Sequence, residues 1–316
     1  MSDPEELRSK YRTGCKAERA LAARDLEAMF AGRDLRLQGL GVIEGATTVD
    51  VLRPNRVIFL ERYSDDDAAA ANAAEPGSVL FIVPPQFPLA SGHARLLSEA
   101  PRADYTRLME TLFDYGRYHR QLDRIDASAR IADSATLMPG VIVGRHSSIG
   151  AGTAVHPNVV IGPNCRIGAD CIIKSGSVIG QPGFGVFRGP DGLPRHFPHV
   201  GGVVIEDWVE VGALNTVCSG SIHPTVIGEF AKLDDHVHVA HNCIVGRRTM
   251  LTAAAELSGS VIIGDDCWVG PNSSVIDGAR IGARAFIGIG ANVTKSVDAD
   301  TVVAGNPARP IPKRTQ

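Results

Sequence analysis

Several features are scarce or missing in this chain, and each absence narrows what the protein can be. The six cysteines form no Cys-x-x-C pair, which argues against a cysteine zinc site and against a disulfide framework. No apolar run is long enough to span a membrane and the N-terminus carries no signal-peptide pattern, so we expect a soluble cytoplasmic protein without a transmembrane segment. The net charge is −3 and basic residues are not clustered, so we expect no nucleic-acid partner.

A period of six dominates the second half of the chain. Every sixth residue is aliphatic, apart from two breaks, and this period fits neither a helix nor a simple strand. It predicts short strands joined by sharp turns and stacked into a parallel β-helix, with one inward aliphatic side chain per hexad. The inward positions are Ile131, Leu137, Val143, Ile149, Val155, Ile161, Ile167, Ile173, Ile179, Ile205, Val211, Val217, Ile227, Leu233, Val239, Val245, Leu251, Leu257, Ile263, Val269, Val275, Ile281, Ile287 and Val293.

The rest of each hexad supports the same structure. A small residue stands four positions after most of the aliphatic residues, and the alternation of a strand turns it inward as well. Cys165, Cys171, Cys243 and Cys267 occupy this position, so we expect them to be small buried hydrophobic residues. Gly or Asp often follows the aliphatic residue directly, where we expect the unusual backbone angles of a tight corner.

Composition and periodicity divide the chain into five segments. Residues 1–35 have helical spacing of apolar residues, and 36–116 combine strand-like runs at 57–63 and 79–83 with a helix at 105–116 that ends at Gly116. We therefore predict an N-terminal helical segment (1–35), an α+β domain (36–116), a linker (117–130), a β-helix (131–304) and a tail (305–316).

Two insertions interrupt the hexads. The segment 180–204 is rich in Gly and Pro and too polar for a core, and a loop of this length inside a compact repeat is usually functional. The second insertion, 219–225, lengthens its coil by less and predicts a smaller bulge.

At these insertions the sequence resembles the UDP-3-O-acylglucosamine N-acyltransferase family of lipid A biosynthesis. The matching stretches are IGQPGFGV (179–186), FPHVGGVVIEDWVEVGALNT (197–216) and HVAHNCIVG (238–246). The N-terminal domain also resembles the nucleotide-recognition domain of that family. The resemblance implies a left-handed β-helix, a homotrimer, an acyl carrier protein or acyl-CoA as donor, a UDP-linked amino sugar as acceptor, and no bound cofactor or metal.

The resemblance also implies catalytic roles for three residues. His241, in the AHN motif, matches the general base of the family, and a histidine titrates in the range that deprotonation of a sugar amine requires. Gly259 lies three hexads further on, one predicted turn of the coil, and matches an oxyanion donor; it can equally be a corner residue. Asp234 matches an acidic residue that orients His241, and its alternative is again a corner role.

Five residues are expected to bind substrate. Phe59 and Tyr63 resemble the aromatic residues that hold the uracil ring, although ordinary strand packing accounts for them equally well. Phe184 of the Gly-Phe-Gly loop and His199 lie in the matching stretches. Asn242 contacts either the substrate or a corner of the backbone.

The chain departs from the family pattern in three places. No histidine follows His241, and Gly278 stands near the position of a second family histidine. Cys218-Ser219 replaces an Asp-Arg pair. The ending VVAGNPARPIPKR resembles the last coil of acetyl-CoA-dependent hexapeptide acetyltransferases instead of a long helical extension, so the donor is either acyl carrier protein or a short acyl-CoA.

Three other functions stay open. One is an acetyl-CoA-dependent nucleotide-sugar acetyltransferase of surface polysaccharide synthesis. Another is a zinc hydratase of the γ-carbonic anhydrase kind, with His236 and His241 as ligands and His199 or His223 as the third. The last is a non-catalytic scaffold, against which the long insertion and the AHN corner argue.

Overall fold

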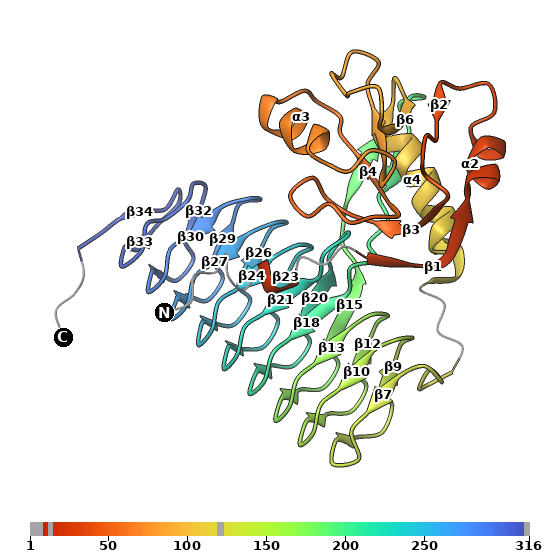
Figure 1. Ribbon diagram of the computed structural model, residues 1–316. Helices are drawn as coiled ribbons and strands as arrows, with labels where there is room; N and C mark the ends of the chain where they lie inside the picture. Colours follow the sequence, from red (N-terminus) through yellow and green to blue (C-terminus); the bar gives the residue numbers. More distant parts are fainter. Residues whose placement is uncertain (1–8, 12–14, 119–122, 313–316) are drawn as a thin grey trace. The chain divides into compact units, whose positions relative to one another are not determined.

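The computed structural model describes residues 9–11, 15–118 and 123–312, and these form two compact units. The coil unit consists of 9–11, 123–184 and 199–312, and the N-terminal unit consists of 15–118 and 185–198. Most of the long insertion therefore belongs to the N-terminal unit. The chain leaves the coil unit before this part of the insertion and returns to the coil unit after it. Figure 1 follows the chain through both units.

The coil unit is a parallel β-helix whose described strands form three sheets of eight, ten and eight strands. The first contains β7 (Arg130–Ile131), β10 (Ser148–Ile149), β13 (Arg166–Ile167), β18 (Val203–Ile205), β21 (Thr225–Ile227), β24 (Ile244–Val245), β27 (Ile262–Ile263) and β30 (Arg280–Ile281). The second contains β8 (Thr136–Leu137), β11 (Ala154–Val155), β14 (Ile172–Ile173), β19 (Glu210–Val211), β22 (Lys232–Leu233), β25 (Met250–Leu251), β28 (Trp268–Val269), β31 (Phe286–Ile287), β33 (Val302–Ala304) and β34 (Arg309–Pro310). The third contains β9 (Ile142–Val143), β12 (Val160–Ile161), β15 (Val178–Pro182), β20 (Thr216–Ser219), β23 (His238–Val239), β26 (Glu256–Leu257), β29 (Ser274–Val275) and β32 (Asn292–Val293).

The register between coils confirms the hexad prediction. Ile149 pairs with Ile167, which stands three hexads further along the chain. Ile167 then pairs with Ile205, a much longer separation, because the long insertion falls in this coil. Ile205 pairs with Ile227, again more than three hexads away, because the second insertion falls between them.

The predicted inward positions form the core of the β-helix. The aliphatic residues from Val143 to Val293 are buried in one hydrophobic cluster, and the small residues between them are buried as well. Small polar side chains at this position bond to the next coil: Ser147 Oγ donates to Gly162 O at 2.7 Å, and Thr249 Oγ1 donates to Gly264 O at 2.8 Å. These buried hydroxyl groups are thus satisfied inside the core.

The cysteines at the inward position behave as predicted. They are buried free thiols, and burial raises the pKa of Cys165 and of Cys243 to about 12. Their thiolate forms are therefore negligible near neutral pH, which makes them packing groups and not nucleophiles.

The glycines that follow the aliphatic residues have a different role from the one predicted. Their φ angles are not in the left-handed region for the most part, and the positive φ falls two residues later, as at Asn164 (55°). A Cβ on Gly162 would lie 2.5 Å from Gly180 O, and one on Gly246 would lie 2.4 Å from the Gly264 carbonyl carbon. Glycine is needed there because adjacent coils approach closely, whereas Asn, Asp and Arg among others take the strained corner angle.

The N-terminal unit is an α/β structure around a six-stranded sheet of order β1-β3-β4-β5-β6-β2. The central strands β3 to β6 are parallel to one another, while β1 and β2 are antiparallel edges. The strands are β1 (Cys15–Ala22), β2 (Leu35–Arg36), β3 (Val42–Ala46), β4 (Arg56–Phe59), β5 (Val79–Val83) and β6 (Ala94–Leu97). The helices are α2 (Ala23–Met29), α3 (Asp65–Asn72), α4 (Pro101–Leu112) and α5 (Tyr115–Tyr118).

Two predictions for the N-terminal half are wrong in detail. The segment Cys15–Ala22 is strand β1 and not a helix, because pairing with β3 and burial of Leu21 override the helical propensity of its alanines. Within the predicted 1–35 helix, residues 9–11 and α2 (Ala23–Met29) are helical, the chain turns after α2, and 1–8 and 12–14 lie outside the described residues. The helix near 105 does not end at Gly116, since Phe113 caps α4 and Asp114 takes the positive φ.

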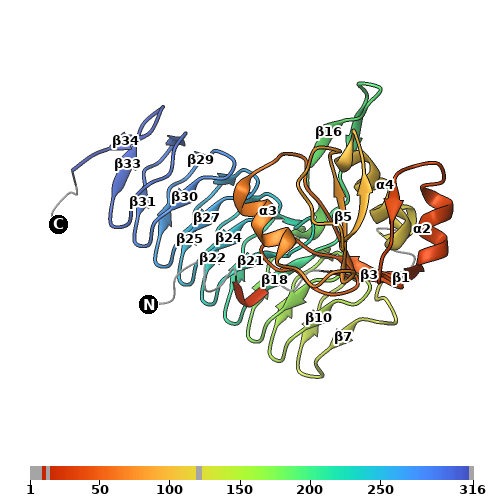
Figure 2. The same cartoon turned by 45° about the horizontal axis from the view of Figure 1, so that its top comes forward.

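The predicted strands at 57–63 and 79–83 correspond to β4 and β5, and the long insertion forms a hairpin. Its strands are β16 (Val186–Arg188) and β17 (Pro194–His196), which pair antiparallel (Figure 2). At the end of the hairpin, Phe197 stacks on Tyr105 of α4 with ring centroids 5.8 Å apart. The described part of the C-terminal tail is likewise ordered, with β34 paired to β33.

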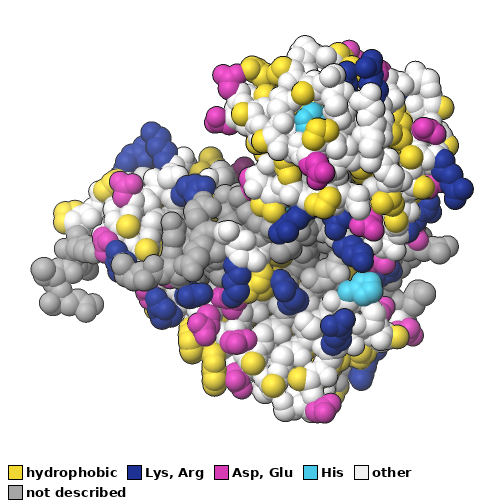
Figure 3. Space-filling view, in the orientation of Figure 1, with side chains coloured by type: hydrophobic (Ala, Val, Ile, Leu, Met, Phe, Trp, Pro, Cys, Tyr) yellow, Lys and Arg dark blue, Asp and Glu magenta, His cyan; other side chains and the backbone are white. Residues whose placement is uncertain are grey.

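Charges of both signs are mixed on the surface that Figure 3 shows. On this face, basic and acidic side chains are interspersed and hydrophobic side chains form scattered patches. Such an arrangement agrees with the balanced charge of the sequence. No helix among the described residues has the length and apolar character to cross a bilayer.

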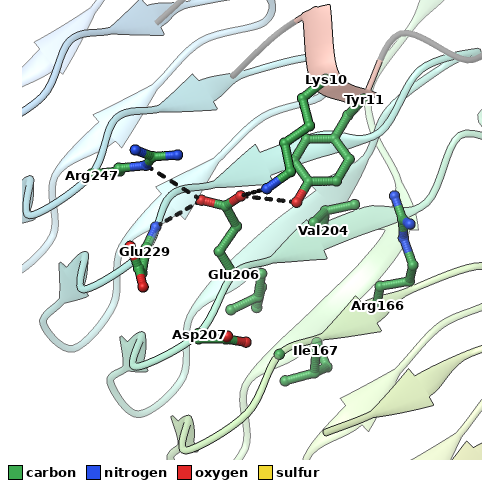
Figure 4. A pocket seen from close by; sticks show the side chains of 11 residues that line it. Lys10, Tyr11, Arg166, Ile167, Val204, Glu206, Asp207, Glu229 and Arg247 are labelled. Carbon is green, nitrogen blue, oxygen red and sulfur yellow. Dashed lines mark hydrogen bonds and ion pairs between the residues drawn. The ribbon is translucent and has the colours of Figure 1, made fainter. Parts of the chain in front are cut away.

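A short N-terminal segment is fastened to the coil unit by one buried carboxylate. Glu206 accepts hydrogen bonds from Lys10 Nζ at 2.6 Å, from Tyr11 Oη at 2.9 Å and from Glu229 N at 3.1 Å, in a pocket of about 320 Å³ (Figure 4). Burial raises the pKa of Glu206, but these donors outweigh it and the pKa lies below its usual value. The basic and acidic side chains in the pocket balance one another's charge. We therefore interpret the pocket as a structural attachment of the N-terminal segment.

We predict that Glu206→Gln lowers the free energy of unfolding at pH 7 by about 1–2 kcal/mol, because two charge-assisted hydrogen bonds are lost. A carboxylate with a depressed pKa stabilises the fold above its unfolded pKa and loses this effect as the pH falls through its folded pKa. The difference between the variant and the parent should therefore shrink below pH 4.5, the ordinary glutamate pKa. Chemical denaturation at several pH values measures it, with Glu110→Gln at an exposed position of α4 as the control.

Candidate functional site

Three residues occupy the same corner position on successive coils. His241, Gly259 and Asp277 each stand two residues after an inward aliphatic residue of the third sheet, and the strands that precede them pair in register. Backbone bonds join the corners, with Ser260 N donating to His241 O and Gly278 N donating to Gly259 O, each at 2.9 Å. The prediction that Gly259 lies in the coil next to His241 is therefore confirmed.

Gly259 lets two side chains converge. A Cβ on Gly259 would lie 2.7 Å from His241 Cε1, 3.0 Å from His241 Nε2 and 2.7 Å from Asp277 Oδ1. The imidazole edge and the carboxylate thus both lean over the space that a side chain would fill. Any residue other than glycine would push one of them aside.

Two parts of the insertion flank the imidazole of His241. Gly183 packs against the ring, since a Cβ there would lie 2.8 Å from His241 Cδ2. The buried ring of His199 meets it edge to face with centroids 5.0 Å apart. The Gly-Phe-Gly loop and the stretch after the hairpin therefore both contribute to the surroundings of His241.

Asn242 fixes the other edge of the imidazole. Its Nδ2 lies 3.0 Å from His241 Nδ1, while its Oδ1 accepts hydrogen bonds from Ser221 N at 2.8 Å and from Ser221 Oγ at 3.1 Å. Ser221 belongs to the second insertion, so this small bulge supplies the support for the histidine. The arrangement leaves Nε2 as the ring nitrogen that faces Gly259.

The surroundings keep His241 neutral near pH 7. Burial lowers the pKa of His241 below its usual 6.5, the charge of Asp277 acts in the opposite direction, and His238 adds to the lowering. A neutral imidazole can accept a proton, which general base catalysis requires.

Asp234 does not lie beside His241 in the described structure. It is exposed at a different corner, where its Oδ1 accepts the backbone N–H of Asp235 at 2.8 Å and its charge acts on Lys174. Its predicted role in orienting His241 is not supported by a contact, and the corner role accounts for its position. The carboxylate near His241 is that of Asp277.

The predicted aromatic residues have separate environments. Phe59 packs on Tyr105 and Phe197, with ring centroids 4.7 Å and 5.8 Å away. Tyr63 is 57% exposed, hydrogen-bonds to Asp65, and its ring lies 6.3 Å from that of Phe87. Phe59 therefore serves packing in this structure, whereas Tyr63 is available to a ligand.

Phe184 is the most exposed large apolar side chain of the described residues, at 84%. It follows Gly183 directly, so it stands next to the glycine that packs on His241. Its predicted part in substrate binding stays a prediction.

The N-terminal unit contains a pocket of about 920 Å³ near Phe59. Arg102 lines it, lies over the Phe59 ring at 5.7 Å and pairs with Glu61 at 2.7 Å. Arg33 and Asp104 form a second pair at 2.7 Å on its wall. Charged side chains of both signs line the pocket together with apolar ones such as Leu97 and Phe187.

The last coil has a smaller pocket of about 260 Å³, lined by residues from Val293 to Pro310. Lys295 and Arg309 supply positive charge there, and the chain passes through a cis Asn306–Pro307 bond. This is the segment whose sequence resembles the last coil of acetyltransferases.

No three His, Cys, Asp or Glu side chains among the described residues form a metal-ligating group. His236 is exposed at a corner with φ 60°, away from the His199–His241 contact. The hydratase hypothesis therefore has no observation in its favour within this part of the chain.

Asp277 and Gly183 are the residues that sequence reasoning missed. Asp277 could have been found by stepping two turns of the coil from His241 and not one. Gly183 was part of the motif, but its contact with His241 depends on how the insertion folds back.

Comparisons with known proteins agree with this architecture. The family model described as bacterial transferase hexapeptide (six repeats) matches residues 146–181 and 260–295. The chain is 44% identical over 137 residues to the UDP-3-O-acylglucosamine N-acyltransferase of Caulobacter sp. (strain K31), covering 43% of this chain and 40% of that protein. The enzyme with the same description in Herminiimonas arsenicoxydans is 34% identical over 155 residues, covering 49% and 44%.

Among solved structures, the chain is similar to the UDP-N-acetylglucosamine O-acyltransferase of Moraxella catarrhalis. The identity is 31%, the TM-score is 0.54, and the match covers 59% of this chain and 71% of that one. The Francisella novicida UDP-N-acetylglucosamine acyltransferase is 27% identical with a TM-score of 0.53, covering 61% and 69%.

The parallel β-helix of hexads defines the class of hexapeptide-repeat proteins. The half-buried histidine at a corner adds a candidate acid–base site. The chain belongs to the bacterial hexapeptide transferases. It spans less than half the length of the curated relatives that it matches, 40% for the Caulobacter protein.

We predict that Gly259→Ala strongly reduces activity without unfolding the protein. The new methyl group would displace the His241 ring or the Asp277 carboxylate, and a misplacement of about 1 Å costs about 10²-fold in rate. Acyl transfer and thermal unfolding are measured together. The control is Gly116→Ala, where a Cβ meets nothing within 4 Å; equal activity of both variants would contradict the prediction.

Proposed function

We propose that the protein transfers an acyl group from an acyl thioester to the amine of a UDP-linked amino sugar, as an N-acyltransferase of lipid A biosynthesis. The observation that carries this proposal is the corner where His241, neutral and half-buried, faces Gly259 beside the Gly-Phe-Gly loop. The curated relatives with the same described activity support it.

In the proposed reaction the sugar amine attacks the thioester carbonyl carbon and forms a C–N bond. The carbonyl oxygen becomes an oxyanion, for which the backbone N–H of Gly259 is the proposed donor. His241 Nε2 takes the proton of the amine, the C–S bond breaks as the tetrahedral intermediate collapses, and the proton passes to the leaving thiolate. The products are an amide and a free thiol.

Proton uptake at Nε2 requires a particular orientation of the Asn242 amide. In the structure the amide nitrogen of Asn242 lies 3.0 Å from Nδ1, and the tautomer of the ring decides which of the two atoms donates. When Nε2 accepts a proton in the reaction, Nδ1 must carry a hydrogen, and the amide of Asn242 must present its oxygen. Asn242 is therefore proposed to position His241 and not to bind substrate directly.

The acceptor and donor sites are proposed from the two other pockets. The pocket near Phe59, which combines the charged Arg102 and Glu61 with apolar side chains, suits a nucleotide sugar. The pocket of the last coil, with Lys295 and Arg309, suits the phosphate groups of a phosphopantetheine thioester. Acyl carrier protein and CoA share this group, so both donors stay in the proposal. The segment VVAGNPARPIPKR, which resembles the last coil of acetyl-CoA-dependent acetyltransferases, keeps a short acyl-CoA among them.

The six cysteines support a cytoplasmic location. All are free and buried in the structure, as expected of a protein that folds in a reducing compartment.

We predict that one donor class supports transfer to a UDP-amino sugar and that His241→Ala lowers the rate by about 10²–10⁴-fold, the usual contribution of a general base. The protein is incubated with a panel of UDP-amino sugars and with acetyl-CoA or a 3-hydroxyacyl carrier protein, and product mass is followed. Transfer only from the carrier protein supports the lipid A reaction. Transfer only from acetyl-CoA supports the surface-sugar acetyltransferase, and a fully active His241→Ala variant contradicts both.

A homotrimer is proposed as well, and the outer face of the second sheet supports it. Met250, Trp268 and Phe286 lie in register on three consecutive coils, with Met250 42% and Phe286 43% exposed. The rings of Trp268 and Phe286 are stacked at 6.0 Å. An exposed apolar row of this kind is typical of an interface between copies.

We predict that native mass spectrometry gives three chains per particle and that Phe286→Glu shifts the population towards monomer, because a buried unpaired charge opposes association. The exposed Asn292→Glu on another sheet is the control for added charge. A parent protein that stays monomeric at micromolar concentration would contradict the proposal.

A further inference from the structure

We infer that Asp277 is a positioning residue that holds His241 and stabilises its protonated form from two coils away, across Gly259. The inference rests on the proposed function in one respect, since it assumes that His241 takes up a proton in the reaction. It goes beyond that function because it assigns the partner of the histidine to a residue that the sequence analysis did not select.

The geometry of the coils brings these two side chains near each other. Two successive coil spacings separate the backbones at His241 and Asp277 by roughly 10 Å, too far for side chains that point straight outward. The corner between them carries no side chain, so both side chains lean over Gly259. The point where its Cβ would stand lies 3.0 Å from His241 Nε2 and 2.7 Å from Asp277 Oδ1.

The nitrogen that faces Asp277 is the one on which the proposed reaction places a proton. Asn242 contacts Nδ1 and leaves Nε2 towards the Gly259 corner. A carboxylate near Nε2 attracts the positive ring more than the neutral one, so it makes protonation of His241 easier. The role of Asp277 is therefore electrostatic support of the imidazolium that forms during acyl transfer.

Other charged and titratable groups do not replace this support. His238 opposes protonation of His241, and Glu256 accepts a hydrogen bond from Ser258 Oγ at 3.0 Å. The buried ring of His199 contacts His241 with its edge and carries no negative charge that could replace that of Asp277. The ring of His199 and the charges of Asp277 and His238 act on His241. Glu256 is the register partner of His238 in the next coil, and Lys295 stands at the equivalent corner of the coil after Asp277.

Next to Asp277, the coil has open space. A Cβ on Gly278 would meet no atom within 4 Å, and Asp277 and Ile276 are exposed. The carboxylate can therefore adjust its position when the histidine becomes charged. It also means that substitution of Asp277 leaves the packed core unchanged.

The test is a titration of His241 itself. Histidine labelled with ¹³C at Cε1 is observed by NMR in the parent protein and in Asp277→Asn, with the His241 signal assigned by its loss in His241→Gln. We expect the pKa of His241 to fall in Asp277→Asn, because the neutral amide keeps the shape and removes the attraction. The matched control is Asp298→Asn, which removes an exposed carboxylate elsewhere and should leave this pKa unchanged.

Activity measurements then connect the charge to the reaction. In Asp277→Asn, the acidic limb of the pH profile of kcat/KM should move to lower pH. The rate at its plateau should fall about tenfold, less than the loss on removing a general base. Asp277→Glu, which restores the charge on a longer arm, should recover part of both effects.

The outcomes separate this inference from the proposed function. An unchanged His241 pKa in Asp277→Asn overturns the inference, whatever the activity, and a fall in rate alone would then assign Asp277 to another role. A shifted pKa with a fully active His241→Gln variant supports the pairing and overturns the proposed function. A shifted pKa together with a shifted pH profile supports both.

Discussion

The hydrogen-bonded register between successive coils underlies every other feature of this protein. Each short strand pairs with the strand three hexads further on, except where an insertion lengthens the coil. Glycines allow the coils to approach, and small inward side chains such as Ser147 and Thr249 bond to the carbonyl of the next coil. A slip of a single position would turn the aliphatic row outward, so the hydrophobic effect fixes the register strongly.

The same register builds the candidate site. Residues at equivalent corners are stacked although they are far apart in sequence. The side chains of His241 and Asp277 approach each other because the corner between them is Gly259, which has no side chain. The insertions then add what a regular coil cannot supply. Gly183 and His199 border the ring of His241, and Ser221 holds Asn242 against it. The regular coils fix the position of His241, and the two insertions supply the residues that surround its ring.

The N-terminal unit shows the opposite balance between local and long-range effects. Residues 15–22 carry alanines and a helix-like spacing, yet they form an edge strand because β3 offers unpaired backbone groups and Leu21 becomes buried. Phe59 was expected either to hold a uracil ring or to pack within its domain, and the structure places it against Tyr105 and Phe197. Its partner Phe197 comes from an insertion much later in the chain, which no local pattern indicates.

The β-helix, its coil period, both insertions and the placement of His241 next to Gly259 all follow from the amino-acid sequence, because a period of six repeated many times leaves one way to bury the aliphatic residues. Local composition also pointed to strands β4 and β5. The folded chain was needed to show that Asp277 and not Asp234 lies beside His241, that Gly183 packs on its ring, and that the hairpin belongs to the N-terminal unit. Hexad position fixes which way a backbone corner points, whereas the direction of a side chain depends on the space that its neighbours leave empty.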